Sequence, residues 1–103
     1  MVALTVFYPK TADSHFDMAY YLATHTPLVK DRLTHHGLVR VDMLEGMAGG
    51  APDSPPTYAM ITSLVFNTVD ELQSGMGTHG AELLGDIPNF TDVTPHTQVN
   101  QVR

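Results

Sequence analysis

The sequence predicts an α+β fold whose elements follow the order β-α-β-β-α-β. The segments 2–8, 38–44 and 58–66 are short and β-rich, and they alternate in the way that strands do. Two longer segments carry apolar residues at intervals of three and four, the spacing of one helix face. At 103 residues the chain has the length of one domain, so residues 1–103 are interpreted as a single domain.

The first strand and the first helix are predicted from the N-terminal third. Residues 2–8, VALTVFY, are apolar on both alternating faces, which is typical of a strand covered on both sides. Residues 15–36 then follow a helical period, with Ser14-x-x-Asp17 as a possible capping box and Gly37 as a left-handed stop. One stripe of this helix carries Met18, Tyr21, Leu22, His25, Val29 and Leu33. The opposite side carries Phe16, Tyr20 and Pro27, whose ring should bend the helix.

The middle of the chain is predicted to form two strands joined by a loop. LVRVDML at 38–44 is the second strand, and YAMITSLVF at 58–66 is the strongest strand pattern in the chain. The connecting residues 46–57 are rich in glycine and proline, which indicates a surface hairpin loop rather than a domain linker.

The C-terminal third predicts one more helix and one more strand. Thr68-x-x-Glu71 is a capping box for a helix that we expect to fray near Gly80. Its apolar stripe is Val69, Leu72, Met76 and Leu83. The last strand is expected near 91–102, where Pro95 restricts it to a sheet edge or a bulge.

This element order is that of the ferredoxin-like arrangement, a four-stranded antiparallel sheet with two helices on one face. The strands at 2–8 and 58–66 nevertheless carry large apolar residues on both faces. No further element of the chain remains to cover the second face. A second copy of the chain is the most economical cover, and a homodimer is therefore predicted.

Composition excludes several classes of function. The formal charge is −6, from 11 acidic and 5 basic residues, and the basic residues form no run, so neither nucleic acid nor a membrane surface is an expected partner. No segment has the length of a membrane span. The N-terminus MVALTVFYPK begins on a strand pattern without a signal-like segment, which favours a cytoplasmic protein.

The sequence also lacks the signatures of thiol, metal and nucleotide chemistry. It contains no cysteine, so thiol nucleophiles, disulfides and zinc–thiolate sites are excluded. The six histidines show no metal-binding spacing, and no phosphate-binding glycine motif follows a strand. No cofactor is therefore expected.

The strongest candidate for chemistry is His25. Tyr21 lies four residues before it, so both side chains share the helix face that should lie on the sheet. The bend expected at Pro27 could open space beneath the helix there. A polar imidazole beside a phenol in an apolar pocket could orient a ligand or move protons. The alternative is a packed core histidine that is satisfied by the phenol or by a backbone carbonyl.

Two further polar residues could border the same space. Asp86, in the loop GDIPNF, and His79, near the predicted end of the second helix, could form an orienting pair for acid–base chemistry. The alternative is that Asp86 only caps a turn while His79 is solvated.

Several segments together resemble the EthD family over essentially the whole chain. They are LTVFYPK, then FD-x-x-YY-x-x-x-H-x-P, a Pro/Gly-rich hairpin, and LLGDIPNFTDVTPHTQVNQV. The resemblance implies the dimeric α/β-barrel superfamily, in which two ferredoxin-like units pack sheet to sheet. It also implies catalytic roles for His25, Tyr21 and Asp86, and a substrate-binding wall at Phe90. Met18, Tyr20 and His79 are the other candidates for substrate contact.

The resemblance implies a small catabolic enzyme, classed by family label with oxidoreductases and associated with ethyl tert-butyl ether degradation. It would bind a small apolar or aromatic molecule between helices and sheet without a cofactor. Two alternatives stay open. One is a non-catalytic binding or accessory protein to an oxygenase, and the other is an isomerase or dehydratase that uses the same residues.

Overall fold

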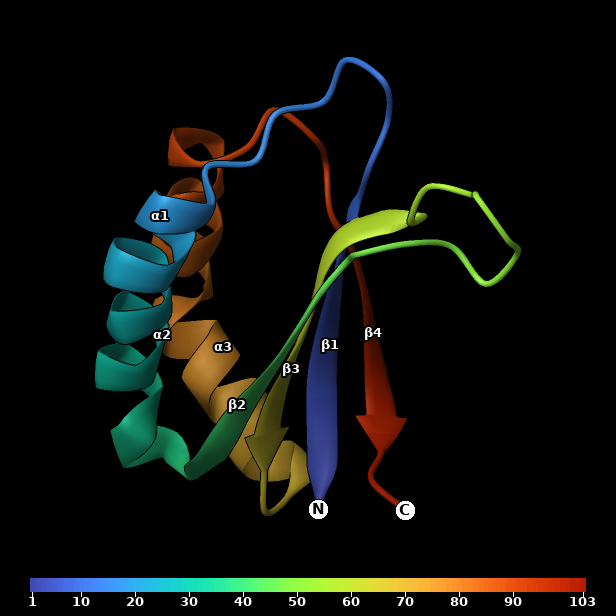
Figure 1. Ribbon diagram of the computed structural model, residues 1–103. Coiled ribbons are helices and arrows are strands. Elements are labelled where there is room, and N and C mark those ends of the chain that lie inside the picture. The colour runs from blue at the N-terminus through green and yellow to red at the C-terminus, as the bar shows by residue number, and fades with distance from the viewer.

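The computed structural model describes residues 1–103 and shows one antiparallel sheet with all helices packed on one face (Figure 1). The strands are β1 (Val2–Pro9), β2 (Leu38–Glu45), β3 (Tyr58–Phe66) and β4 (His96–Gln101). Their order across the sheet is β2-β3-β1-β4, with antiparallel neighbours throughout. The predicted ferredoxin-like order is confirmed.

The register places the same face of all four strands under the helices. Val6 pairs with Thr62 on β3 and with Thr97 on β4, so these side chains form one row across the sheet. β4 is an edge strand that begins directly after Pro95, as the proline requires. The predicted start near residue 91 was too early, because Thr91 forms an isolated bridge with Phe16 instead.

The first helical segment runs without a break from Met18 to His36. It consists of α1 (Met18–Tyr20), a π-helical turn η1 (Tyr21–His25), α2 (Thr26–Leu33) and a 3-10 turn η2 (Thr34–His36). The helix ends at Gly37, whose φ of 86° confirms the left-handed stop.

The start of this helix corrects the predicted capping box. Asp17 is the N-cap, and its carboxylate accepts the Tyr20 N–H at 3.0 Å. Ser14 closes the preceding turn instead, where its hydroxyl donates to the Thr11 carbonyl and accepts the Thr11 N–H. The Ser14 hydroxyl therefore forms its hydrogen bonds within this local turn and does not cap the helix.

A π-helical turn lies directly before Pro27, where the proline predicts a disturbed helix. The Thr26 N–H donates to the Tyr21 carbonyl, five residues back, which widens the helix just before the proline. The extra residue in this turn rotates the buried stripe. Leu22, predicted to face the sheet, is 48% exposed, whereas Thr26 is buried with 6% exposure.

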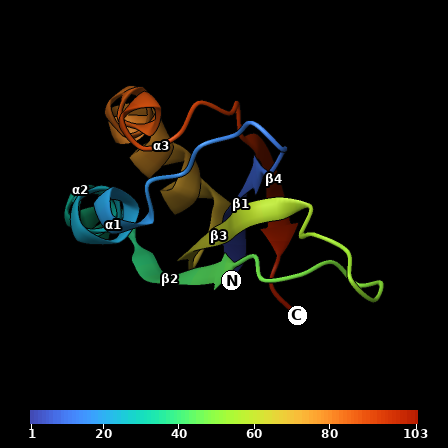
Figure 2. The same cartoon turned by 45° about the horizontal axis from the view of Figure 1, so that its top comes forward.

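The second helix is α3 (Val69–Gly85), which crosses the sheet diagonally beside α2 (Figure 2). Thr68 caps it by accepting the Glu71 N–H at 3.2 Å, as predicted. The helix does not fray near Gly80 but continues to Gly85.

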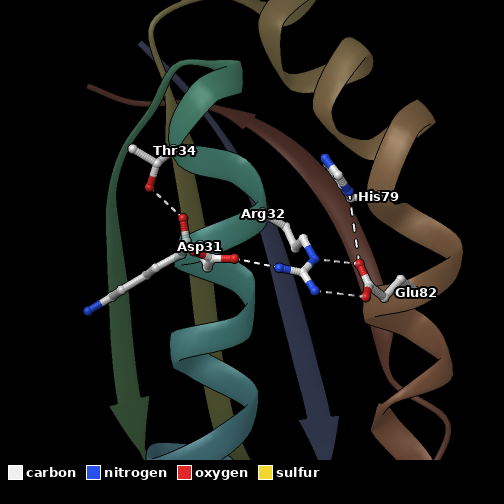
Figure 3. A network of polar contacts seen from close by, with 6 residues as sticks. Asp31, Arg32, Thr34, His79 and Glu82 are labelled. Atoms are coloured by element: carbon white, nitrogen blue, oxygen red, sulfur yellow. Dashed lines mark hydrogen bonds and ion pairs between the residues drawn. The ribbon is translucent and has the colours of Figure 1, made fainter.

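The two long helices approach closely at Gly75. A Cβ atom there would lie 3.0 Å from the His36 Cβ and 3.1 Å from a methyl carbon of Leu33. Glycine thus lets the helices pack at this point. Nearby, Arg32 of α2 donates to both carboxylate oxygens of Glu82 on α3, at 2.9 and 3.3 Å (Figure 3).

The core lies between the helices and the sheet in two clusters. The first is aliphatic except for Phe66 and joins both helices to the sheet. It contains Val2, Val29, Leu33, Leu64, Phe66, Leu72 and Leu83. The second is mainly aromatic and lies under the first helix turns. It contains Val6, Tyr8, Tyr21, Met60, Ile87 and Phe90. The ring of Phe16, predicted to lie on the solvent side, packs on this second cluster, because Phe16 precedes the helix and bridges to Thr91.

The outer face of the sheet carries no helix (Figures 1 and 2). It is more polar than the sequence pattern suggested. The Thr5 hydroxyl lies 2.9 Å from that of Ser63 and accepts the Asn100 amide at 2.7 Å. Phe7 and Tyr58 form an aromatic pair on this face with ring centroids 5.3 Å apart. None of the helices has the length and apolar character that a membrane crossing requires.

Candidate functional site

The site is centred on a hydrogen-bonded pair formed by buried His25 and partly buried Asp86. His25 is 5% exposed, and its Nδ1 atom lies 2.9 Å from Oδ2 of Asp86. The π-helical turn positions the histidine. Asp86 follows the last residue of α3 and begins the 3-10 turn η3 (Ile87–Asn89). Residues separated by 61 positions are thus brought together where the π-helical turn meets the C-terminal end of α3.

The Asp86 carboxylate is held by three side chains. Besides the His25 contact, its Oδ1 accepts the Tyr20 hydroxyl at 2.7 Å and the Asn89 amide at 2.9 Å. Burial acts to raise the pKa of Asp86, but the hydrogen bonds from Asn89, Tyr20 and His25 outweigh it, so this pKa lies below its ordinary value. Asp86 is therefore ionised at neutral pH.

The ionised carboxylate determines the tautomer of His25. A carboxylate can only accept hydrogen bonds, so the Nδ1 atom of His25 carries the proton in this contact. In the neutral imidazole, Nε2 then carries the free lone pair. His25 also lines an apolar cavity between the helices and the sheet, which is described below. Nε2 is therefore the ring nitrogen available to a ligand there.

Tyr21 packs beside His25 rather than orienting it. The two rings are stacked, with centroids 5.4 Å apart and an interplanar angle of 28°. The Tyr21 hydroxyl forms a hydrogen bond with the Thr62 hydroxyl on β3. Burial raises the pKa of Tyr21, although hydrogen bonds with Thr62 and Tyr8 counteract part of this effect. The phenol is therefore protonated at neutral pH.

An apolar cavity of about 50 Å³ lies between the helices and the sheet beside this pair. Leu84 on α3 and Thr97 on β4 are the exposed members of its lining, so the cavity opens between these two elements. The complete lining consists of Leu4, Val6, Tyr8, Tyr21, His25, Thr26, Val29, Val41, Thr62, Leu64, Met76, Leu83, Leu84, Ile87 and Thr97.

The structure brings most of the predicted site residues together, but only some of them line the cavity. Tyr21 and His25 line the cavity, whereas Asp86 lies behind the imidazole. Phe90 is not part of the cavity wall. Its buried ring packs on His25 with centroids 4.7 Å apart. Tyr20 is bonded to Asp86 and does not line the cavity either.

Two of the predicted contact residues lie elsewhere. Met18 borders a separate polar hollow with Lys10 and Glu45. His79 is one helical turn before Glu82, and its Nδ1 lies 3.9 Å from the Glu82 carboxylate on the side of α3 that faces the first helical segment (Figure 3). The sequence placed His79 at a frayed helix end near Asp86. Because α3 continues as a regular helix, His79 faces the first helix and does not reach the cavity.

Sequence reasoning missed the hydroxyl groups of the cavity. Thr62, Tyr8 and Thr26 line it together with His25. A signal was present in the strand YAMITSLVF, where Thr62 shares the apolar face of Met60 and Leu64. A polar residue in the middle of an otherwise apolar face of a strand is a candidate for ligand contact.

No group of three or more histidine, aspartate or glutamate side chains has an arrangement that could hold a metal ion. The candidate site therefore consists of one imidazole, one carboxylate and a set of hydroxyls, all around an apolar cavity. Such a set can remove and return protons and can donate hydrogen bonds to an oxygen atom.

Comparison with known proteins identifies a family and solved structures that are similar to this chain. The EthD domain family matches residues 10–94. The structure of an EthD-like protein from Ralstonia eutropha JMP134 is 36% identical, with a TM-score of 0.91 over 98% of this chain and 90% of that chain. No curated protein matches this chain.

More distant structures share the fold alone. An ethyl tert-butyl ether (EthD) family protein from Bacillus halodurans C-125 is 16% identical, with a TM-score of 0.68 over 100% of this chain and 99% of that chain. SnoaB from Streptomyces nogalater, a cofactor-independent oxygenase, is 12% identical, with a TM-score of 0.58 over 99% of this chain and 91% of that chain.

Proposed function

The chain belongs to the EthD family, and from this premise we propose that it is a small cytoplasmic catabolic enzyme. It transforms a compact apolar or aromatic molecule in the cavity beside His25 and needs no cofactor. The family label places it with oxidoreductases, and the cofactor-independent oxygenase of the same fold is compatible with that class.

The observation that carries this proposal is the hydrogen-bonded His25–Asp86 pair, whose imidazole lines an apolar cavity. A neutral imidazole with its Nδ1 proton on a carboxylate has a basic Nε2. When Nε2 takes a proton from a substrate, the adjacent Asp86 charge stabilises the imidazolium that forms. Apolar walls strengthen this interaction because little water screens it. A merely structural histidine would need no cavity at its second nitrogen.

Ligand binding and product formation can be tested in two stages. In the first, thermal unfolding of the protein is followed with small aromatic compounds and compounds derived from branched ethers. We expect some of them to stabilise the wild type but not the His25→Ala variant. His79→Ala is the matched control, since His79 lies outside the cavity. A folded His25→Ala variant that is stabilised as much as the wild type contradicts the proposal.

In the second stage, the mass of the product identifies the reaction. Oxygenation adds oxygen, dehydration removes water, and isomerisation leaves the mass unchanged. Ligand binding without any product, in air or without oxygen, would instead support a binding or accessory protein for an oxygenase.

We infer that the working form is a homodimer in which two sheets face each other, as in the dimeric α/β-barrel superfamily. The uncovered outer face, with half-buried Phe7 and Tyr58, supports this arrangement. Light scattering at micromolar concentration should give twice the mass of 11.2 kDa. Phe7→Glu should produce monomers, whereas Val99→Glu, on the other face of the sheet, should not. A monodisperse wild-type monomer contradicts the inference.

A further inference from the structure

The hydroxyl groups of Tyr21 and Thr62 form a second polar feature of the cavity, distinct from the imidazole. Tyr21 comes from the helical wall and Thr62 from the sheet wall, and their hydroxyls meet in a hydrogen bond. Both residues line the cavity that His25 also lines. Tyr8 adds a third hydroxyl from the neighbouring strand, with its ring edge-on to Tyr21 at 5.8 Å between centroids.

This hydroxyl pair has a donor to spare. Each hydroxyl carries one proton and can accept as well as donate. Their mutual bond uses only one of the two protons, whichever residue donates. Neither hydroxyl forms another hydrogen bond with a carbonyl or a carboxylate of the chain. The second O–H is therefore available to an oxygen atom in the cavity. If the Tyr8 hydroxyl joins this row of hydrogen bonds, one O–H still remains free. The added hydroxyl brings one proton, and the added hydrogen bond uses one.

The base belongs to the helical wall of the cavity, whereas the donor pair joins that wall to the sheet. The imidazole of His25 belongs to the first helical segment, whereas the Tyr21 side chain extends across to Thr62 on the sheet. A molecule between helix and sheet can then contact Nε2 at one atom and a hydroxyl at another. A carbonyl group with a C–H on the next carbon offers both an acidic hydrogen for the base and an oxygen for the donor pair.

We propose that the Tyr21–Thr62 hydroxyl pair is an oxyanion-binding site, and that the substrate class is a compact carbonyl compound with an acidic C–H next to the carbonyl. This inference rests on the proposed role of His25 as the base. The C–H bond breaks, its proton moves to Nε2 of His25, and its electron pair shifts to the carbonyl oxygen. The hydroxyl pair donates to the resulting enolate oxygen. The imidazolium then returns a proton to carbon, so the step needs no oxidant.

The size of the cavity restricts the substrate further. A cavity of about 50 Å³ is well below the ~150 Å³ of a cavity that holds benzene. A ketone of a few carbon atoms fits with small side-chain movements. An aromatic substrate would need a larger cavity than this one.

Deuterium exchange tests the inference without knowledge of the natural substrate. Butanone and nitroethane are incubated with the protein in D2O, and loss of the acidic C–H signal is followed by proton NMR. Nitroethane serves as a second probe because its conjugate base carries negative charge on oxygen. We expect the wild type to accelerate exchange of both probes, and His25→Ala to abolish the acceleration.

Variants of the hydroxyl pair separate this inference from the role of the base. Removal of one oxyanion donor typically lowers a rate by about 10²–10³-fold. Because the remaining hydroxyl can still donate, Tyr21→Phe and Thr62→Val should each lower the exchange rate at least ~10-fold, and the double variant by about 10²–10³-fold. Thr62→Ser keeps the hydroxyl and should therefore exchange faster than Thr62→Val. Thr5→Val is the matched control, since Thr5 is buried on the other face.

The outcomes distinguish the two proposals. If the folded double variant exchanges at the wild-type rate while His25→Ala does not, the base role stands and the oxyanion site is overturned. If the wild type leaves both probes at the buffer rate, the base role is overturned and the inference with it. Should the double variant fail to fold, the contrast between Thr62→Val and Thr62→Ser decides, and equal rates in these two overturn the oxyanion site.

Discussion

The Asp86→Asn substitution probes the charge that organises the candidate site. The carboxylate accepts three hydrogen bonds, from His25, Tyr20 and Asn89. An amide of the same shape has one oxygen acceptor and presents an NH2 group in place of the other. If the amide oxygen faces His25, the side chains of Tyr20 and Asn89 lose their acceptor, and the reverse orientation leaves the Nδ1 proton of His25 unpaired.

The magnitude of the effect follows from these contacts. A hydrogen bond to a charged group contributes about 1.5–3 kcal/mol and a neutral one about 0.5–1.5 kcal/mol, so each bond that loses its charge loses about 1 kcal/mol. With one acceptor lost as well, we expect the free energy of unfolding to fall by about 2–3 kcal/mol at pH 7. Because a change of 1 kcal/mol shifts Tm by about 4–8 °C in a domain of this size, Tm should fall by roughly 8–24 °C.

The effect must also depend on pH, with a sign that the pKa determines. Hydrogen bonds hold the pKa of folded Asp86 below its ordinary value of 3.8. The stability that its charge provides is therefore complete above about pH 3.8 and is lost as the pH falls through the lower folded value. The difference between wild type and variant should thus shrink in strongly acidic solution.

Urea denaturation at one protein concentration, at pH 7 and at successively lower pH, measures this difference. Asp92→Asn is the matched control, because exposed Asp92 accepts only the backbone N–H of His15. It should change the free energy of unfolding by less than ~1 kcal/mol. An Asp86→Asn variant as stable as the wild type, or a loss that is equal at every pH, would refute the reasoning.

Three further variants test the packing and the ends of the helices. Gly75→Ala should lower the free energy of unfolding by about 1 kcal/mol, because overpacking at the tight helix contact outweighs the gain in helix propensity. Gly77→Ala in the same helix meets open space and should raise it by up to ~1 kcal/mol, and a stabilised Gly75→Ala would contradict the close approach. Glu82→Gln removes an exposed ion pair with Arg32 and should lower stability by less than ~1 kcal/mol, with an effect that disappears in high salt, as denaturation at two salt concentrations will show. Thr68→Ala removes an N-cap and should lower stability by about 1 kcal/mol, whereas Thr68→Ser should not, and equal Tm values for the two would contradict the cap.

The sequence alone determined the strands, the two helical segments and their order. Strand β3 spans Tyr58–Phe66, as its apolar pattern predicted, because period-two alternation is a local property. The cap at Thr68 and the left-handed stop at Gly37 are also local, since they depend on one side chain or one φ angle. The helical neighbours Tyr21 and His25 share a face for the same reason.

Only the tertiary structure decided which residues meet at the site. The π-helical turn before Pro27 turned Leu22 outward and Thr26 inward, and helical periodicity cannot predict a change in the number of residues per turn. The sequence suggested that His79 and Asp86 border the same space. The continuation of α3 beyond Gly80 keeps them apart.

The hydrogen bond between the Tyr21 and Thr62 hydroxyls likewise could not be predicted from the sequence. The bond between Tyr21 and Thr62 joins a helix to a strand 41 positions away, and the bond between His25 and Asp86 spans 61 positions. Contacts of this kind depend on the packing of helices on a sheet, which sums many weak apolar interactions. The residue types of the site could therefore be read from the chain, whereas their partners and the cavity between them exist only in the folded protein.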